Sequence, residues 1–257
     1  MNNVIALIPA RLQSSRLPGK PLAEIGGIPM VWHVCMRAAE ALGHENVFVV
    51  TDSPRIVEAV RSRGGNAILS DRPADCGTTR CAHALERIAT DAEIILNLQA
   101  DEPFIATDDI RNLADSLSDP AFRIATLARK FDPADGFETL FSPDNTKVVF
   151  DNSMGALYFS RSIIPYVRGV EWKQWLETAT FHIHAGTYAF RRQTLLSLPS
   201  LPPSPAEEAE RLEQLRWLAA GLRIKVVLTE TSLIGVDTPE ELELARKRFD
   251  ELHCNEK

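Results

Sequence analysis

The stretch that decides the fold is Val4-Ile5-Ala6-Leu7-Ile8-Pro9-Ala10-Arg11-Leu12-Gln13-Ser14-Ser15-Arg16-Leu17-Pro18-Gly19-Lys20-Pro21-Leu22. Its first part, residues 4–8, is a continuous apolar run of strand length, which is typical of a parallel strand buried on both faces. The loop that follows carries cations at Arg11, Arg16 and Lys20. Three cations on one short loop repel one another, and a nucleoside triphosphate would offset that repulsion. The stretch therefore predicts a buried strand that ends in a triphosphate-binding loop.

This loop differs from the Walker phosphate-binding motif. Pro21 follows Lys20 where that motif needs Ser or Thr, and no glycine lies five positions before Gly19. Phosphates would therefore be held by side-chain cations and backbone amides in another arrangement. A solvated loop whose charges have no ligand is the simpler interpretation, and the local sequence leaves it open.

Strand-like and helix-like patterns alternate along the first half of the chain. We expect strands at 46–51, 66–69 and 93–98 and helices at 29–42, 54–63 and 78–90. The second half predicts a helix at 108–117, a strand at 124–128, a hairpin of 146–150 with 156–160, strands at 182–190 and 223–229, and helices at 207–220 and 238–252. This order predicts an α/β fold in one domain, residues 1–257, with a Rossmann-like sheet and an antiparallel insertion at about 145–200.

Composition narrows the function classes. The chain has 257 residues, is 45% hydrophobic and carries a net charge of −7, which argues against a nucleic-acid partner. No apolar run reaches the roughly 18 residues that cross a bilayer, and no signal peptide is evident, so we expect no membrane partner. The four cysteines contain no C-x-x-C pair and are expected to be reduced thiols of a cytoplasmic protein.

Two acidic segments follow predicted strands. Asp101 lies in Asn97-Leu98-Gln99-Ala100-Asp101-Glu102-Pro103, and Asp237 lies in Gly235-Val236-Asp237-Thr238-Pro239-Glu240-Glu241-Leu242. Ligands of open α/β sheets bind beyond the carboxyl ends of the strands, where the cationic loop also lies. One or two carboxylates together with phosphates suffice to hold Mg²⁺, so the pair predicts a magnesium site. Both segments are also ordinary helix starts, and that interpretation stays open.

Two further groups of polar residues are weaker signals. The turn Asp75-Cys76-Gly77-Thr78-Thr79-Arg80 opens a predicted helix, and its amides and Arg80 are suited to a base edge or a phosphate. Arg161, Arg168, His184 and Tyr188 lie in the predicted insertion, where they fit either a carboxylated, hydroxylated substrate or a dimer interface.

Six motifs occur together in a fixed order: Ile-Pro-Ala-Arg-x5-Leu-Pro-Gly-Lys-Pro-Leu, Gly-Thr-x-Arg, Gln-x-Asp-Glu-Pro, Ala-Leu-Tyr-Phe-Ser-Arg, Leu-Glu-Gln-Leu-Arg and Gly-Val-Asp-Thr-Pro-Glu-x-Leu. In this order they resemble the 3-deoxy-manno-octulosonate cytidylyltransferase family over residues 4–246. The resemblance implies a nucleotide-diphospho-sugar transferase type of fold, mostly parallel. It also implies Mg²⁺-dependent transfer of CMP from CTP to the anomeric hydroxyl of 3-deoxy-manno-octulosonate (Kdo). Pyrophosphate would be released and CMP-Kdo formed for lipopolysaccharide biosynthesis, in a cytoplasmic homodimer.

The resemblance also assigns roles by position. Arg11, Lys20, Asp101 and Asp237 would be catalytic, the two aspartates as magnesium ligands. CTP would contact Pro9, Ala10, Arg11, Arg16, Lys20, Gly77, Thr78 and Arg80. The acidic sugar would contact Gln99, Arg161, Arg168, His184, Tyr188, Glu213 and Gln214.

The chain departs from the family pattern at two of these motifs. Thr79 stands where relatives usually have Glu, and Ala100 stands where they usually have Gly. We hypothesise that these differences alter the choice of sugar and leave CTP use intact, so an amino-Kdo or another 3-deoxy-ulosonate is an alternative acceptor. Sugar 1-phosphates are a second alternative, and a non-enzymatic nucleotide-binding protein is a third.

Overall fold

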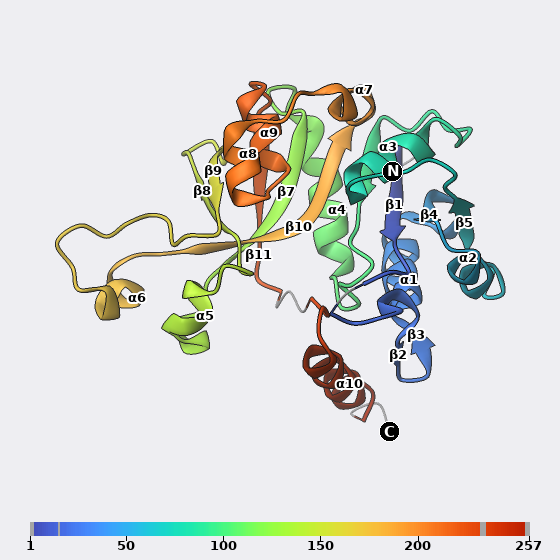
Figure 1. Ribbon diagram of the computed structural model, residues 1–257, viewed down its shortest axis with the longest axis horizontal. Helices are drawn as coiled ribbons and strands as arrows, with labels where there is room; N and C mark the ends of the chain where they lie inside the picture. The colour runs from blue at the N-terminus through green and yellow to red at the C-terminus, as the bar shows by residue number, and fades with distance from the viewer. Residues whose placement is uncertain (1–2, 15, 232–234, 255–257) are drawn as a thin grey trace.

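The fold is built on one sheet of nine strands, and the computed structural model describes residues 3–14, 16–231 and 235–254 (Figure 1). The strand order is β11-β7-β10-β6-β1-β4-β5, and β8 and β9 extend the sheet from β10. Its strands are β1 Val4–Ala10, β4 Val47–Thr51, β5 Asn66–Leu69, β6 Ile94–Asn97, β7 Ile124–Lys130, β8 Lys147–Phe150, β9 Ala156–Ser160, β10 His182–Arg191 and β11 Ile224–Thr229. A separate hairpin pairs β2 Glu24–Ile25 with β3 Ile28–Pro29.

Most neighbouring strands of the core are parallel. The parallel pairs are β1 with β4 and β6, β4 with β5, and β7 with β11. Strand β10 lies antiparallel between β6 and β7, and its register with β7 shifts between His184 and Tyr188. The predicted mixed, mostly parallel α/β sheet is therefore confirmed.

Helices cover both faces of this sheet, because its strands are apolar on both sides. They are α1 Met30–Leu42, α2 Pro54–Arg61, α3 Gly77–Leu85, α4 Thr107–Asp115, α5 Phe137–Phe141, α6 Trp175–Thr178, α7 Arg192–Ser197, α8 Pro205–Glu210, α9 Gln214–Ala219 and α10 Pro239–Cys254. One buried apolar cluster joins a face of the sheet to α1, α2 and α4, and a second joins the other face to α3, α7 and α9. Helix α10 lies apart, beside the β2–β3 hairpin (Figure 1).

The predicted hairpin inside the insertion is confirmed. Strands β8 and β9 pair antiparallel, and Asp151 closes their turn by accepting hydrogen bonds from the backbone N–H groups of Ser153 and Gly155, each at 2.8 Å. The chain after the hairpin projects sideways and carries α6, and α5, which precedes the hairpin in the chain, lies on the same side of the molecule (Figure 1).

Two expectations about elements were wrong. The helix expected at 207–220 is two short helices, because Arg211 adopts a left-handed conformation (φ 54°) between α8 and α9. The helix expected at 78–90 ends at Leu85, and Arg87 in the turn that follows donates to the carbonyl of Leu69 at 3.0 Å.

Two further observations concern membrane spans and cysteines. No helix of the described residues is both long and apolar enough to span a bilayer. Cys35, Cys76 and Cys81 are free thiols, and the side chain of Cys254 lies outside the described residues.

Candidate active site

A polar cavity of about 380 Å³ lies beyond the carboxyl ends of β1 and β6. Segments that are remote in the chain contribute to it: the loop after β1, the residues after β6, the first turn of α3 and Asp237, two residues before α10. It is lined by Pro9, Ala10, Arg11, Gln13, Ser14, Arg16, Lys20, Pro21, Gly77, Gln99, Ala100, Asp101 and Asp237. The expected meeting of the cationic loop with both acidic segments therefore occurs.

Arg16, Lys20, Asp101 and Asp237 form an ion-pair group, which we call the Lys20 cluster. The Lys20 ammonium donates to Asp101 and, at 2.7 Å, to Asp237. Arg16 donates to the other oxygen of Asp237 at 2.8 Å. Burial by itself would lower the pKa of Lys20, but the two carboxylates overcome this and raise its pKa. Lys20 therefore carries a positive charge at neutral pH and lines the cavity.

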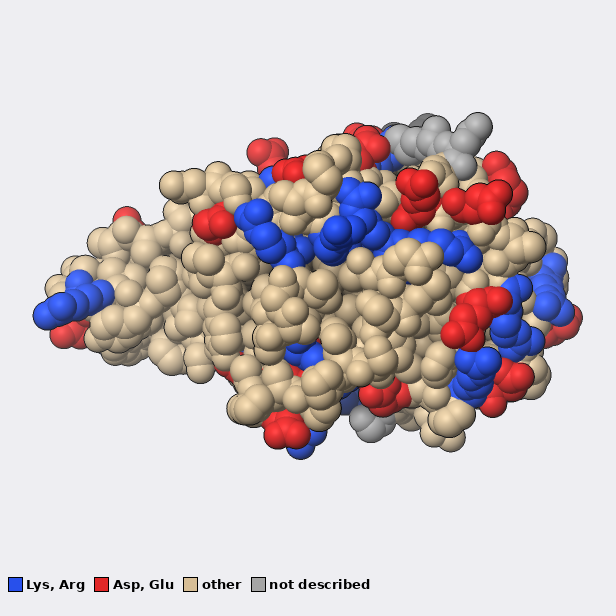
Figure 2. Space-filling view, turned by 90° about the horizontal axis from the view of Figure 1, so that it is seen from above, with Lys and Arg blue, Asp and Glu red and all other residues tan. Residues whose placement is uncertain are grey.

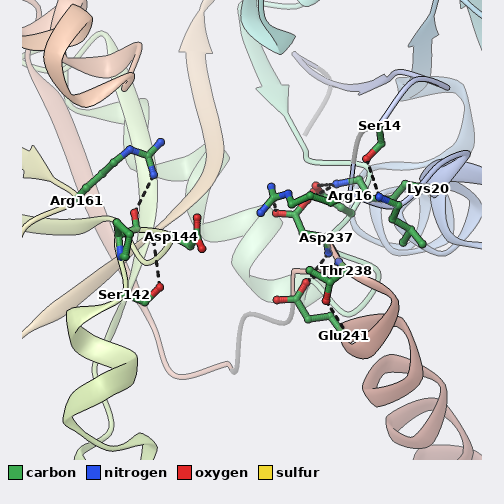
Figure 3. Close-up of polar contacts among 12 residues, drawn as sticks. Ser14, Arg16, Lys20, Ser142, Asp144, Arg161, Asp237, Thr238 and Glu241 are labelled. Atoms are coloured by element: carbon green, nitrogen blue, oxygen red, sulfur yellow. Dashed lines mark hydrogen bonds and ion pairs between the residues drawn. The ribbon is translucent and has the colours of Figure 1, made fainter.

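Hydrogen bonds at the start of α10 hold Asp237 in place (Figure 3). The carboxylate of Glu241 accepts from the backbone N–H groups of Asp237 at 2.7 Å and Thr238 at 2.9 Å. The Thr238 hydroxyl accepts from the N–H of Glu241 at 3.2 Å, which completes a capping box. One residue earlier, the N–H of Val236 donates to the carbonyl of Asp101 at 2.9 Å. The two aspartates are thus tied through the backbone as well as through Lys20.

The chemistry of Asp101 and Asp237 fits a magnesium ion. Their carboxylates converge on one cation, they border an open cavity, and hard oxygen donors are the ligands that Mg²⁺ prefers. Within residues 3–14, 16–231 and 235–254, no group of three or more His, Cys, Asp and Glu side chains is placed to hold a metal ion. The remaining ligands would come from phosphate and water, as is usual for Mg²⁺.

Close packing shapes the wall of the cavity. A Cβ on Gly77 would lie 3.2 Å from Cγ of Pro9, so the small residue lets the start of α3 approach the end of β1. Gln99 also lines the cavity, and its Nε2 donates to the carbonyl of Gly186 in β10 at 2.6 Å. This hydrogen bond connects the wall of the cavity to β10. Ala100 has no left-handed φ and therefore carries no backbone strain that a glycine would relieve.

A second polar group adjoins the cavity behind Gly77. The Thr78 hydroxyl donates to Glu213 at 2.8 Å and lies 3.3 Å from the amide nitrogen of Asn97. Burial raises the pKa of Glu213, and the hydrogen bonds from Cys76 and Thr78 act against that shift. Thr78 and Glu213 border a small cavity of about 80 Å³.

Unpartnered polar atoms in this region are consistent with ligand binding. Arg80 is 3% exposed and donates through one nitrogen to Asp52 at 2.9 Å, while its Nε and Nη1 have no partner among the described residues. Nε2 of buried Gln214 and Oδ1 of buried Asn97 also have no partner there. Buried polar atoms are ordinarily hydrogen-bonded, so these three side chains are suited to bind a polar ligand.

Four of the expected sugar contacts are not among the residues that line the main cavity: Arg161, Arg168, His184 and Tyr188. Arg161 donates to the carbonyls of Glu210 at 2.7 Å and Pro143 at 2.8 Å, and Figure 3 draws it apart from Lys20 and Asp237. Arg168 is exposed in the segment between β9 and α6. Nε2 of His184 lies 2.9 Å from the hydroxyl of Thr126. Tyr188 is buried near Glu213. Burial raises the pKa of Tyr188, and the negative charge of Glu213 raises it further.

Several residues of this region were missed. Gln13 and Ser14 line the cavity, Asn97 holds Thr78, and Asp52 holds Arg80. Gln13 and Ser14 lie inside the quoted loop and follow a strand, which is a signal that sequence reading offers. Asn97 and Asp52 were not identifiable in this way, because their partners lie 19 and 28 positions away.

Comparisons with known proteins agree with this geometry. Residues 5–224 match the protein family described as cytidylyltransferase. The 3-deoxy-manno-octulosonate cytidylyltransferase of Parabacteroides distasonis is 44% identical over 246 residues, with 95% of this chain and 97% of the relative covered. The protein of the same name from Porphyromonas gingivalis is 46% identical, with 94% of each chain covered. A solved structure titled as CMP:2-keto-3-deoxy-manno-octonic acid synthetase complexed with CTP superposes with a TM-score of 0.87 at 40% identity, with 97% of this chain and 99% of that chain covered.

His184 provides a test of the electrostatics on the strand beside this site. Phe159 and Tyr188 pack against its ring, and burial lowers its pKa from 6.5 to about 3. Between about pH 6.5 and pH 3, the imidazole is protonated in the unfolded chain and neutral in the folded chain. The free energy of unfolding therefore falls by about 1.4 kcal/mol for each pH unit of acidification in this range. His184→Gln should have a shallower loss of unfolding free energy between pH 6 and 4, measured by urea titration. Equal slopes would show that the native imidazole is protonated.

Proposed function

The chain belongs to the 3-deoxy-manno-octulosonate cytidylyltransferase family, and we infer that it is an enzyme that transfers CMP from CTP to the anomeric hydroxyl of Kdo. The products are CMP-Kdo, an activated sugar for lipopolysaccharide biosynthesis, and pyrophosphate. The observation that carries this function is the Lys20 cluster beyond the end of β1, which brings two cations and two carboxylates together. The cations are suited to a triphosphate and the carboxylates to a divalent cation. CTP and Kdo are thus the small-molecule partners, and the cytoplasm, where CTP is made, is the proposed location.

We propose that the triphosphate lies along the loop after β1. Arg11 lines the cavity and has no acidic partner among the described residues, so its charge is available to a phosphate. Lys20 and Arg16 add two further cations within the same loop. Attack on the α-phosphorus increases the charge on phosphate oxygens and on the leaving pyrophosphate, and fixed cations stabilise that charge.

Asp101 and Asp237 are the proposed magnesium ligands. When bound, the ion would supply positive charge beside the phosphates and lower the pKa of the attacking hydroxyl. Lys20 neutralises the same two carboxylates, so they remain close together although both are negative. No histidine is needed as a base, and His184, with a pKa of about 3, is neutral at working pH.

The other substrate groups are assigned by their surroundings. We propose that the cytidine contacts Gly77, Thr78 and Arg80, because the free nitrogens of Arg80 are buried donors. The acidic sugar is proposed to contact Gln99, Tyr188, Glu213 and Gln214, with His184, Arg161 and Arg168 on the insertion side. Asn97 and Gln214 support this assignment through their unpartnered amide atoms.

A homodimer is the proposed assembly. We propose that it forms through the projecting part of the molecule that carries α5 and α6, which we call the arm. Phe141, Tyr166 and Trp172 are 54%, 73% and 46% exposed there and border a groove of about 560 Å³. The arm is the narrow end of the molecule in Figure 2, and uncharged side chains cover most of it. Exposed apolar patches of this kind on a soluble enzyme are typical of subunit interfaces.

The activity is tested by pyrophosphate release from CTP and Mg²⁺ with a panel of acceptors. We expect release with Kdo. Release only with sugar 1-phosphates would instead support a sugar-phosphate nucleotidylyltransferase, and CTP binding without release would support a binding protein.

The panel also tests the effect of Thr79 and Ala100. Ala100 lines the main cavity, whereas Thr79 borders the small cavity beside Glu213. Thr79→Glu and Ala100→Gly should change the ratio of kcat/KM for Kdo to that for other 3-deoxy-ulosonates. The KM for CTP should stay constant. An unchanged sugar preference in both variants would refute the hypothesis.

Asp101→Asn should lower kcat by about 10²–10³-fold, because a neutral amide holds Mg²⁺ less well and the positive charge that stabilises the transition state is lost. Asp108→Asn is the matched control, because that carboxylate is 83% exposed and pairs with Arg111. Near-normal turnover of Asp101→Asn at low Mg²⁺ would contradict the metal role.

Lys20→Met should raise the KM for CTP about tenfold or more, since a charge-assisted hydrogen bond to phosphate is lost. An unchanged KM for CTP would show that Lys20 does not bind the triphosphate.

The arm is tested by Tyr166→Glu. A charge in a buried interface is unfavourable, so this variant should move the mass distribution in analytical ultracentrifugation from dimer towards monomer. Leu244→Glu is the control and should stay dimeric, because Leu244 lies on α10 and is 60% exposed. A wild-type monomer would refute the proposed assembly.

A further inference from the structure

A small apolar cluster lies beneath the Lys20 cluster and is separate from the two cores of the sheet. We call it the α10 cluster, and its members are Leu17, Ile25, Met30, Val236, Leu242 and Ala245, with Ala23, Phe104 and Phe249 packed against them. Leu17 directly follows Arg16, and Val236 directly precedes Asp237. The packing of this cluster therefore determines where the charges above it lie.

Helix α10 packs against the β2–β3 hairpin and the start of α1. Nε of Arg246 donates to the carbonyl of Glu24 in the hairpin at 3.0 Å. The ring of Phe249 meets the ring of His33 in α1 edge-on, with centroids 5.4 Å apart. Figure 1 shows α10 beside the hairpin and below the sheet, so the hairpin and α1 together support the helix.

Phe249 is seated directly on Gly26. A Cβ added to Gly26 would lie 2.1 Å from Cε1 of the Phe249 ring, far inside van der Waals contact. Gly26 and Gly27 form the two-residue turn of the hairpin, with φ of +58° and +75°. A Cβ on Gly27 would meet no atom within 4 Å. Both glycines adopt the positive φ that the turn requires, but only Gly26 leaves space for the ring of Phe249.

We propose that Phe249 is a positioning residue, whose ring on Gly26 sets the placement of α10 and thereby holds Asp237 against Lys20. The helix runs about 15 Å from its first residue to Phe249, at 1.5 Å per residue. At its start, Glu241 connects the helix to the backbone of Asp237. Displacement of the ring therefore moves Asp237, while Asp101 and Lys20 keep their contact. The magnesium part of this inference rests on the proposed function.

The test compares Gly26→Ala with Gly27→Ala. Both variants place a methyl group at a positive φ and share that backbone strain, but only Gly26→Ala collides with Phe249. Gly26→Ala should speed hydrogen–deuterium exchange of the amides at 236–245. It should also raise the Mg²⁺ concentration for half-maximal velocity about tenfold or more, with the KM for Kdo unchanged, because supports of metal ligands have effects of that size. Gly27→Ala should show neither change.

A second pair of variants keeps the test decisive if Gly26→Ala folds poorly. Phe249→Ala should reproduce the faster exchange and the higher Mg²⁺ concentration for half-maximal velocity. Phe249→Leu in the Gly26→Ala background should reverse part of both changes by removing the collision. Leu244→Ala is the control for truncation on the same helix, since that side chain is exposed.

Two results separate the inference from the function on which it rests. Equal amide exchange and equal Mg²⁺ dependence in the Gly26 and Gly27 variants would overturn the positioning role. A wild-type enzyme that transfers CMP without Mg²⁺ would overturn the metal proposal, while the exchange comparison would still decide whether Phe249 positions Asp237.

Discussion

The contact of Lys20 with Asp101 and Asp237 is the interaction on which the site depends. It joins residues that are 81 and 217 positions apart in the chain. Two carboxylates held this close repel each other unless a cation lies between them, and Lys20 supplies that cation without a ligand. The site can therefore be assembled before substrate enters, which avoids an ordering cost on binding.

Two different parts of the fold support this contact. The sheet places the ends of β1 and β6 side by side, which fixes the loop and Asp101. Asp237 does not follow a strand directly. It precedes α10, which packs on the β2–β3 hairpin and on α1 through the α10 cluster. The acidic pair thus combines a residue on the rigid sheet with a residue on a separately supported helix. A second group, around Thr78 and Glu213, lies behind Gly77 and provides buried polar atoms at the other end of the site.

Local pattern predicted the elements that local physics controls. The buried strands, α1, α2, α4 and the β8–β9 hairpin follow from apolar runs and from the polar turn that Asp151 closes. The break at Arg211 was not predicted, because nothing in the apolar spacing of 207–220 indicates a left-handed residue. The β2–β3 hairpin was overlooked although Gly26-Gly27 is a typical two-residue turn. Its strands of two residues each are too short for a periodicity to appear.

By itself, the sequence determined the fold class, the cationic loop and the two acidic segments. The fold class follows from the order of strand and helix patterns, and the loop and acidic segments follow from the types of neighbouring residues. It also carried the motif order that indicated the family. Only the tertiary structure decided which charges meet, that Lys20 bridges both aspartates, and that Arg161 is turned towards Pro143 and Glu210. The physical reason is that ion pairs, buried polar atoms and ring contacts such as Phe249 on Gly26 depend on distances between segments, and sequence spacing does not contain those distances.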